Sequence, residues 1–147
     1  MGEAPYVSAD LHLKLAADRE RLSDVTDAIE ELGARKGWPP DFLFRMNLVL
    51  EEMALNVMTH GRDAGATELE IIVACEGEGV TIQIVDDGPR FDPLEDAPLP
   101  DPEAPLQDRP VGGLGLHLVR TMIDEITYRY QDGRNRLQMK TTKTESV

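Results

Sequence analysis

The feature that most constrains this fold is a pair of alternating apolar and polar runs that are neighbours in the sequence. They cover residues 68–76 and 80–85 and are joined by Gly77-Glu78-Gly79. Alternation with a period of two is typical of strands that bury one face, and a short glycine-containing connection favours a hairpin. The middle of the chain therefore predicts two paired strands.

Further strands are expected on either side of this hairpin. Residues 11–16 alternate and predict an edge strand, while residues 125–130 and 136–142 predict two final strands that meet at a turn over residues 132–135. The chain thus has enough predicted strands for one sheet. The apolar face of that sheet must be buried against another layer.

Helices are expected over residues 18–35, 41–60 and 115–123. Asp18 can cap the first helix, and Gly61 is expected to end the second. The apolar residues of the first helix lie on one face: Leu22, Val25, Ile29 and Leu32. Helices unevenly interleaved with strands predict an α+β sandwich, with one helical layer over one mixed, mostly antiparallel sheet.

Length and composition predict a single domain over residues 1–147, with tails at 1–9 and 144–147. No apolar run approaches the about 20 residues that a membrane span needs, and the first residues lack a signal-peptide pattern. We therefore expect a cytoplasmic protein without membrane contact, and a buried structural thiol at Cys75. A formal net charge of −13 argues against direct binding of nucleic acid.

Residues 92–110 differ in composition from the rest of the chain. Six of the ten prolines lie here among acidic residues, and Arg109 is the only basic side chain of the segment. Loops of this length inside a small domain are usually lids or disordered segments. A lid is our interpretation.

A polar stripe is expected on the second helix, in what we call the asparagine motif (residues 52–61, E-M-A-L-N-V-M-T-H-G). Glu52, Asn56 and His60 are spaced four and four, so they share one side of an α-helix, whereas Glu51 projects about 100° away from Glu52. The residues on the adjacent face are apolar and should enter the core: Met46, Val49, Leu50, Met53 and Val57.

These three polar residues suit phosphate chemistry. An asparagine oxygen is a suitable ligand for Mg²⁺. A glutamate one turn earlier can deprotonate a hydroxyl that attacks a phosphate, and His60 can donate a hydrogen bond to phosphate. The alternative is a solvated helix face, which we would favour without the two motifs that follow.

The second motif, the Asp-Gly motif (residues 85–93, V-D-D-G-P-R-F-D-P), comes directly after a predicted strand. A carboxylate at a strand end can accept a hydrogen bond from the adenine amino group, and Gly88 leaves room for a purine. The D-x-G register selects Asp86 and makes Asp87 the less favoured contact. The alternative is an ordinary turn between strands.

The third motif, the glycine motif (residues 112–117, G-G-L-G-L-H), opens the last predicted helix. Gly112, Gly113 and Gly115 can leave backbone N–H groups free to cradle phosphate at a helix N-terminus. Arg109, just before them, either meets a terminal phosphate or is solvated. We interpret His117 as structural or exposed.

Together the three motifs resemble the GHKL ATPases (gyrase, heat-shock chaperone, histidine kinase and mismatch-repair type) over residues 10–143. The short anti-sigma-factor serine kinases of bacterial partner switching are the most similar branch, because their second motif is D-x-G-x-x-F-D-P and their third is G-G-L-G-L. Pro89-Arg90 departs from the D-x-G-x-G of many GHKL proteins and agrees with this branch.

This resemblance implies a Bergerat fold that binds ATP and Mg²⁺ between helices and sheet. It implies that Asn56 is the Mg²⁺ ligand and Glu52 the general base of a protein serine/threonine kinase. The other implied ATP contacts are His60, Asp86, Gly88, Phe91, Arg109, Gly112, Gly113, Leu114 and Gly115. The implied partners are a STAS-type anti-anti-sigma antagonist and a sigma factor or other response protein, and a homodimer is possible.

Two other functions remain open from the sequence. One is an ATP-gated binding module that transfers phosphate slowly or never. The other is a nucleotide-binding fragment of a histidine kinase, which is weakened because no helix with a suitable histidine comes before the motifs and His12 lies in the predicted edge strand. The motifs of other phosphate and hydrolase chemistries, such as the P-loop and the G-x-S-x-G elbow, are absent from the sequence.

Overall fold

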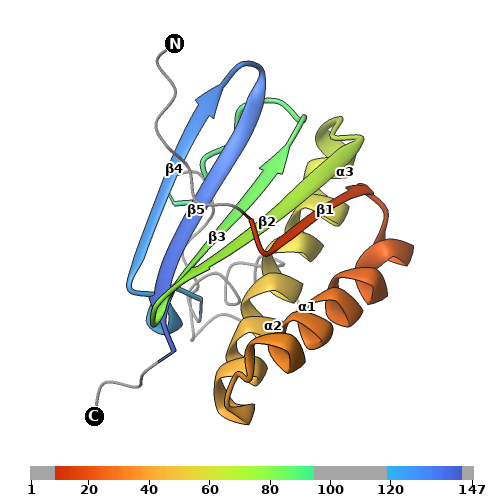
Figure 1. Cartoon of the computed structure of the whole chain (residues 1–147). Helices are drawn as coiled ribbons and strands as arrows, with labels where there is room; N and C mark the ends of the chain where they lie inside the picture. The colour runs from red at the N-terminus through yellow and green to blue at the C-terminus, as the bar shows by residue number, and fades with distance from the viewer. Residues whose placement is uncertain (1–8, 95–118, 144–147) are drawn as a thin grey trace, which may run out of the picture.

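The computed structural model describes residues 9–94 and 119–143, which form two layers (Figure 1). Helices α1 and α2 cover one face of a five-stranded sheet with strand order β1-β2-β3-β5-β4. The elements in chain order are β1 (Leu11–Ala16), a 3-10 turn η1 (Arg19–Arg21), α1 (Leu22–Lys36), α2 (Pro40–Asn56), a π-helical turn η2 (Val57–Gly61), α3 (Arg62–Ala64), β2 (Glu68–Glu76), β3 (Gly79–Asp86), β4 (Glu125–Gln131) and β5 (Arg134–Thr142).

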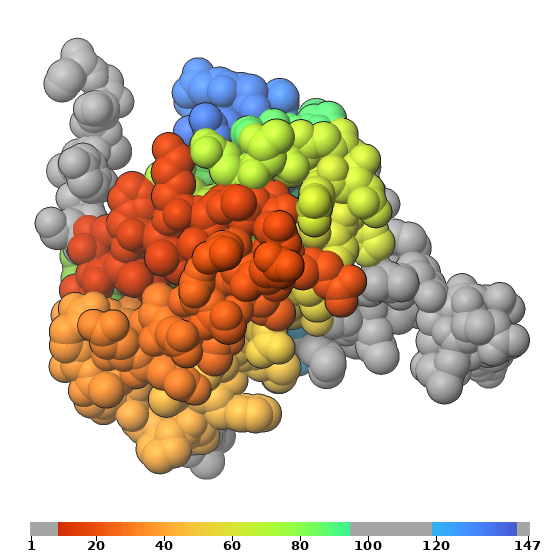
Figure 2. Space-filling model, turned by 90° about the vertical axis from the view of Figure 1, so that its right-hand side faces the viewer, coloured from red at the N-terminus to blue at the C-terminus, as the bar shows by residue number. Residues whose placement is uncertain are grey.

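The structure confirms the expected strands and the α+β sandwich, but all four strand pairs among the described residues are antiparallel, so the sheet is not mixed as expected. β1 lies at one edge and pairs only with β2 among the described strands, with Leu11 opposite Val73. β2 pairs with β3, β3 with β5 and β5 with β4, and each of these pairs is antiparallel. Figure 2, which looks at the side that carries β1 and α1, shows both at the front of the molecule.

The last hairpin differs from the expectation at its turn. Gln131 pairs with Arg134, so the turn has only Asp132 and Gly133 at its tip, both with positive φ (56° and 72°). Positive φ at both central residues is the geometry of a type I′ turn, which matches the twist of the strands. The expected turn over residues 132–135 is therefore too long, and Asn135 belongs to β5.

The start of the first helical segment agrees with the expectation. The Asp18 side chain accepts a hydrogen bond from the Glu20 N–H, and α1 buries the face that contains Val25, Ile29 and Leu32. Gly33 allows α2 to come close, because a Cβ at this position would lie 2.9 Å from Leu43 Cδ1.

The second helix does not end at Gly61, which corrects the expectation from the sequence. The helical path runs from α2 through the π-helical turn into α3, and Gly61 has ordinary helical angles (φ −63°, ψ −45°). The glycine that ends the path is Gly65, with φ 123°. Glycine permits a helix to end but does not force it to, which explains the error of four residues.

The core lies between the helical layer and the sheet. The five predicted core residues of the second helix, Met46, Val49, Leu50, Met53 and Val57, are all buried. They share one cluster with the inward side chains of β2 and β3, which include Ile71, Val73, Ile82 and Ile84. The side chains that the helical period of 3.6 residues and the strand period of two residues predict to be buried thus form one core.

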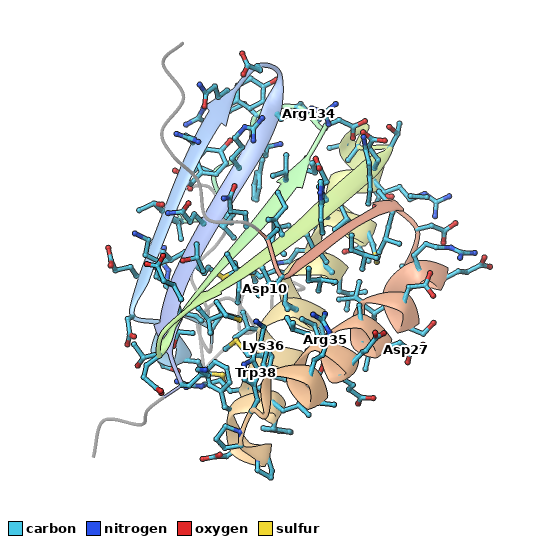
Figure 3. All side chains as sticks on the ribbon, viewed as in Figure 1. Asp10, Asp27, Arg35, Lys36, Trp38 and Arg134 are labelled. Carbon is cyan, nitrogen blue, oxygen red and sulfur yellow. The ribbon has the colours of Figure 1, made fainter. Side chains whose placement is uncertain are left out.

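Asp10 joins three elements beside the first residue of β1 (Figure 3). Its carboxylate forms an ion pair with Lys36 at the end of α1 (2.7 Å) and accepts a hydrogen bond from the Cys75 N–H in β2 (2.7 Å). The hydrogen bonds from Lys36 and Cys75 hold the pKa of Asp10 below its usual value. The Cys75 thiol is half-buried rather than buried, and burial raises its pKa.

Several sequence predictions lie outside the described residues. These are the two tails, most of the 92–110 segment, Arg109, and the glycine motif with Gly112, Gly113, Leu114, Gly115 and His117. Of the helix expected at 115–123, residues 119–123 are described, and 119–122 are helical. No helix within 9–94 or 119–143 is long and apolar enough to cross a membrane.

Candidate functional site

Asp86 lies at the end of β3 with one carboxylate oxygen fixed and the other open. Its Oδ1 accepts hydrogen bonds from the Gly88 N–H (2.8 Å) and from Asn135 Nδ2 (3.0 Å). Among the described residues, no group donates to its Oδ2. Burial raises the pKa of Asp86 above its usual value, although the hydrogen bonds from Asn135 and Gly88 oppose the shift. An acceptor held in one orientation at a strand end is suited to bind a ligand donor.

Asp87 has a different environment although it is the next residue. Its carboxylate accepts hydrogen bonds from the backbone N–H groups of Thr67 (2.7 Å) and Glu68 (3.1 Å) and from the Thr67 hydroxyl. Burial raises the pKa of Asp87, but these hydrogen bonds together lower it below its usual value. Asp87 is thus occupied in fixing the start of β2, which leaves Asp86 as the carboxylate available to a ligand.

Ala66 connects the asparagine motif to the Asp-Gly motif. Its N–H donates to the Gly61 carbonyl (2.8 Å), and a Cβ on Gly61 would lie 3.5 Å from the Ala66 Cβ. On the other side, a Cβ on buried Gly88 would lie 3.1 Å from the Ala66 Cβ and 3.0 Å from Asp86 Oδ1. The end of the helical path and the end of β3 therefore meet around one small side chain. No pattern in the sequence marked Ala66 for this position.

Glu52 and Asn56 occupy the last turns of α2, and both are half-buried. Glu51 is exposed, as the helix phase predicts. Burial raises the pKa of Glu52, and the neighbouring charge of Glu51 raises it further. A carboxylate with a raised pKa is a better proton acceptor, which is the property that a general base needs.

His60 is exposed and lies within the π-helical turn, not in a regular α-helix. The hydrogen bonds of such a turn run from residue i to i+5, so the even four-residue spacing holds between Glu52 and Asn56 but not between Asn56 and His60. The expectation that Glu52, Asn56 and His60 form one regular stripe is therefore wrong for His60. Single π-helical turns inside longer helices are frequent at functional sites.

Asn135 is a site residue that the sequence analysis missed. Its side chain is only 7% exposed and faces the Asp-Gly motif from β5. Its Oδ1 accepts hydrogen bonds from the Phe91 N–H (2.9 Å) and the Tyr128 hydroxyl (2.5 Å), while Nδ2 lies within reach of Asp86 and of two carbonyls in the motif. The Asp132-Gly133 pair was the signal that could have found it. A two-residue turn there puts Asn135 on the inward face with Leu137 and Met139.

Leu94, near the start of the expected lid, contacts Arg120, which follows the undescribed residues 95–118. The Arg120 side chain donates to the Leu94 carbonyl (2.8 Å), and Leu94 in turn donates from its N–H to the Asp92 carboxylate (2.9 Å). Arg45 of α2 donates to the carbonyls of Met122 (3.2 Å) and Thr142 (3.0 Å). The Leu94 carbonyl is thus held by Arg120, and the Met122 carbonyl is held by Arg45 of α2.

Comparisons with known proteins identify the family of this chain. The model of the histidine kinase-like ATPase domain matches residues 15–141. The chain belongs to the histidine kinase-like ATPase family. Its relatives in this family include proteins called serine-protein kinase RsbW from Bacillus cereus and Bacillus thuringiensis, each 25% identical over 140 residues, which cover 93% of this chain and 88% of theirs.

Solved structures show the same ATPase fold. The structure of the RsbU and RsbW domains of a Mycobacterium tuberculosis protein superimposes with a TM-score of 0.63 at 15% identity, over 90% of this chain and 32% of that one. The Acinetobacter baumannii histidine kinase AdeS gives a TM-score of 0.53 at 16% identity, over 90% and 68% of the two chains. The match to a two-domain chain explains the smaller share in the first case.

Asn56 is the candidate metal ligand that the sequence predicts for this domain. The half-buried amide of Asn56 presents an oxygen beside the half-buried carboxylate of Glu52 on the same helix. Within residues 9–94 and 119–143, no three His, Cys, Asp or Glu side chains are grouped so that they could hold a metal ion. Asn56 is the kind of hard ligand that Mg²⁺ takes alongside water and phosphate oxygens.

Proposed function

We propose that this protein is an ATP-dependent serine/threonine kinase of the anti-sigma type, which binds ATP with Mg²⁺ at the ends of α2 and β3. The observation that carries the proposal is Asp86. Its Oδ1 is held by two donors while no described residue donates to Oδ2, and buried Gly88 beside it has no side chain. This arrangement suits the amino group of adenine, with Gly88 leaving space for the ring.

The remaining contacts in the proposal follow the three motifs. Asn56 would hold Mg²⁺, which would neutralise charge on the phosphates. Two exposed side chains would border the nucleotide: Phe91 of the Asp-Gly motif and His60 of the asparagine motif. Arg109 and the N–H groups of Gly112, Gly113, Leu114 and Gly115 would contact phosphate, and residues 92–110 would form the lid.

The chemical step that we propose uses Glu52. Its carboxylate would accept the proton of a serine or threonine hydroxyl on the antagonist protein while that oxygen bonds to the γ-phosphorus of ATP. The bond from the γ-phosphorus to the bridging oxygen breaks in the same displacement, and ADP leaves. The half-buried position and raised pKa of Glu52 support this role.

The proposed partners are a STAS-type anti-anti-sigma antagonist and a sigma factor or other response protein, in the cytoplasm and without contact with membrane or nucleic acid. The named serine-protein kinase relatives support a protein substrate. We also propose a homodimer, for which Leu48 and Leu55 on α2 are candidates. Both are half-buried, so part of each side chain remains accessible. Light scattering that reports only a 16.3 kDa species at high concentration would exclude the dimer.

Calorimetry with Mg-ATP tests the nucleotide site. We expect a Kd in the micromolar range, as an order-of-magnitude estimate for a cleft that binds adenine and phosphates. Asp86→Asn should weaken binding, and Asn56→Ala should remove its dependence on Mg²⁺. Asp132→Asn is the matched control, because it removes the same charge at the β4–β5 turn, where asparagine also tolerates a positive φ. Unchanged, magnesium-independent binding by both site variants would refute the proposal.

A further inference from the structure

One buried amide holds the Asp-Gly motif in place. Asn135 lies opposite Asp86 in the β3–β5 register, at the point where the two strands cease to pair. Its Nδ2 is 3.0 Å from Asp86 Oδ1, 2.9 Å from the Pro89 carbonyl and 3.2 Å from the Gly88 carbonyl. A single side chain thus contacts the carboxylate and the backbone that follows it.

The orientation of this amide is determined by its partners. The Phe91 N–H can only donate, so the amide atom 2.9 Å from it must be the oxygen, which also accepts from Tyr128. The nitrogen must then face Asp86. Because Nδ2 donates to Oδ1 together with the Gly88 N–H, Oδ1 is engaged, whereas no described residue donates to Oδ2.

We propose that Asn135 is a positioning residue that sets the nucleotide selectivity of the site, an inference that rests on the proposed ATP site. Asn135 fixes which oxygen of Asp86 faces the base and keeps that carboxylate ionised against the effect of its burial. Adenine presents an amino donor where guanine presents a carbonyl acceptor. An ionised, correctly turned Asp86 therefore favours ATP, and losing the amide should weaken this preference.

The ionisation part of the proposal can be measured without nucleotide. The hydrogen bond from Asn135 stabilises the charged form of Asp86 and opposes the desolvation that raises its pKa. Asn135→Ala should therefore raise the pKa of Asp86 further in the free protein. NMR titration of the Asp86 carboxyl carbon reports this shift directly, whether or not ATP binds.

The selectivity part is measured as the ratio of the Kd values for GTP and ATP. We expect Asn135→Ala to reduce this ratio by about tenfold or more, the effect of losing a hydrogen bond to a charged group. Gln138→Ala is the matched control, because Gln138 is the next amide along β5 and lies on the opposite face of the strand. It should leave both the ratio and the pKa of Asp86 unchanged.

Asn135→Asp keeps the shape of the side chain and both acceptor contacts, so it serves even if the alanine variant does not fold. The second oxygen of the introduced carboxyl group would face Asp86, and the two carboxylates would share a proton only as the pH falls. The ATP affinity of this variant should then rise as the pH is lowered from 8 to 6, because the introduced carboxyl group, once protonated, can donate to Asp86 as the amide does. The wild type should show no such rise.

The outcomes separate the two proposals. If wild-type protein does not bind ATP while Asn135→Ala still raises the pKa of Asp86, the proposed function and the selectivity fail, and only the effect of Asn135 on the Asp86 carboxylate stands. If wild type binds ATP but the alanine or aspartate variants leave the GTP-to-ATP ratio, the Asp86 pKa and the pH trend unaltered, the positioning role is overturned. A lower thermal stability alone, with these three readouts unchanged, would likewise assign Asn135 to structure only.

Discussion

Asp86 and Asp87 show how two identical neighbours acquire different chemistry from their surroundings. Asp87 accepts three hydrogen bonds from Thr67 and Glu68 and has a lowered pKa. Asp86 is more deeply desolvated, accepts two hydrogen bonds on one oxygen and has a raised pKa. The fold therefore uses Asp87 to stabilise the start of β2, whereas burial imposes a cost on the charged form of Asp86.

That cost predicts the effect of Asp86→Asn on stability. The asparagine oxygen can replace Oδ1 as the acceptor, while the buried charge is removed. Because the pKa of Asp86 is raised in the folded state, its contribution to stability is complete below the unfolded pKa of about 3.9 and is lost as the pH rises through the folded pKa. The free energy of unfolding of Asp86→Asn should thus equal or exceed that of wild type at pH 7.

Urea denaturation at pH 7 and pH 3.5 checks this, with Asp132→Asn as the control for charge. The difference between Asp86→Asn and wild type should shrink at the lower pH, where wild-type Asp86 is protonated. A variant clearly less stable than wild type at pH 7 would show that the charged form of Asp86 is needed by the fold.

The two adjacent glutamates of α2 give a second residue-scale prediction. Glu52→Gln should retain Mg-ATP binding and lower phosphoryl transfer to an antagonist protein by about 10²–10⁴-fold, because a positioned base contributes that much. Glu51→Gln is the control, since Glu51 is exposed one residue away. Transfer of label from γ-labelled ATP measures the rate. If Glu51→Gln is the damaging change, our choice between the two is wrong, and if neither matters the protein is an ATP-gated binding module.

At the scale of elements, the helical path from α2 to α3 differs most from what the sequence predicts. The π-helical turn Val57–Gly61 lies between two α-helical segments, and the path ends at Gly65, not Gly61. Gly61 has helical angles, so it makes the helix less stable than a residue with a side chain would. Gly65 has φ 123°, a conformation in which a residue with a side chain is strained. The two glycines should therefore respond oppositely to substitution.

Gly61→Ala should stabilise the protein by about 0.5–1 kcal/mol, the difference in helix propensity. There is room for the methyl group, since its nearest neighbours, Val57 Cγ1 and Ala66 Cβ, lie at 3.4 and 3.5 Å. Gly65→Ala should destabilise by about 1–3 kcal/mol, because alanine is strained at that φ. Urea unfolding of the two variants gives both values, and a destabilising Gly61→Ala would mean that the π-helical turn cannot accept a side chain there.

The elements that periodicity defines could be predicted from the sequence, and the site could be predicted in part. Alternation located β1, β2 and β3, and the helix phase placed Glu52 inward and Glu51 outward because each depends on local spacing. The π-helical turn could not be foreseen, since the residue spacing there does not differ from that of a regular α-helix; in the structure the turn ends beside Ala66. Asn135 was missed because its role depends on a strand pairing 49 residues away in sequence. The roles of the glycine motif remain predictions.

At the scale of the whole molecule, Asp10 connects the helical layer to the sheet. Its carboxylate joins the end of α1 to β2, and its backbone carbonyl accepts from Arg35 (3.3 Å). Because the hydrogen bond from Lys36 lowers the pKa of Asp10, the stabilising contribution is present above the unfolded pKa and is lost as the pH falls through the folded pKa.

Asp10→Asn should therefore lower the free energy of unfolding at pH 7 by about 1–2 kcal/mol, as expected for hydrogen bonds to a charged group near the surface. The difference from wild type should shrink as the pH falls from 7 through the folded pKa of Asp10. Asp27→Asn, on the exposed side of α1, is the control and should have little effect. Thermal unfolding across this pH range tests the claim. A constant difference at every pH would attribute the loss to packing instead.

The pairing of β1 with β2 also has a consequence for synthesis on the ribosome. Leu11 pairs with Val73 and Ala16 with Glu68, so β1 leaves the exit tunnel well before the strand that will pair with it. During that interval Leu11, Leu13 and Leu15 lie on a segment that lacks β2, the strand with which it pairs. A nascent chain of this protein thus carries an open strand edge until β2 emerges, and it is at that stage that chaperones would have the most to bind.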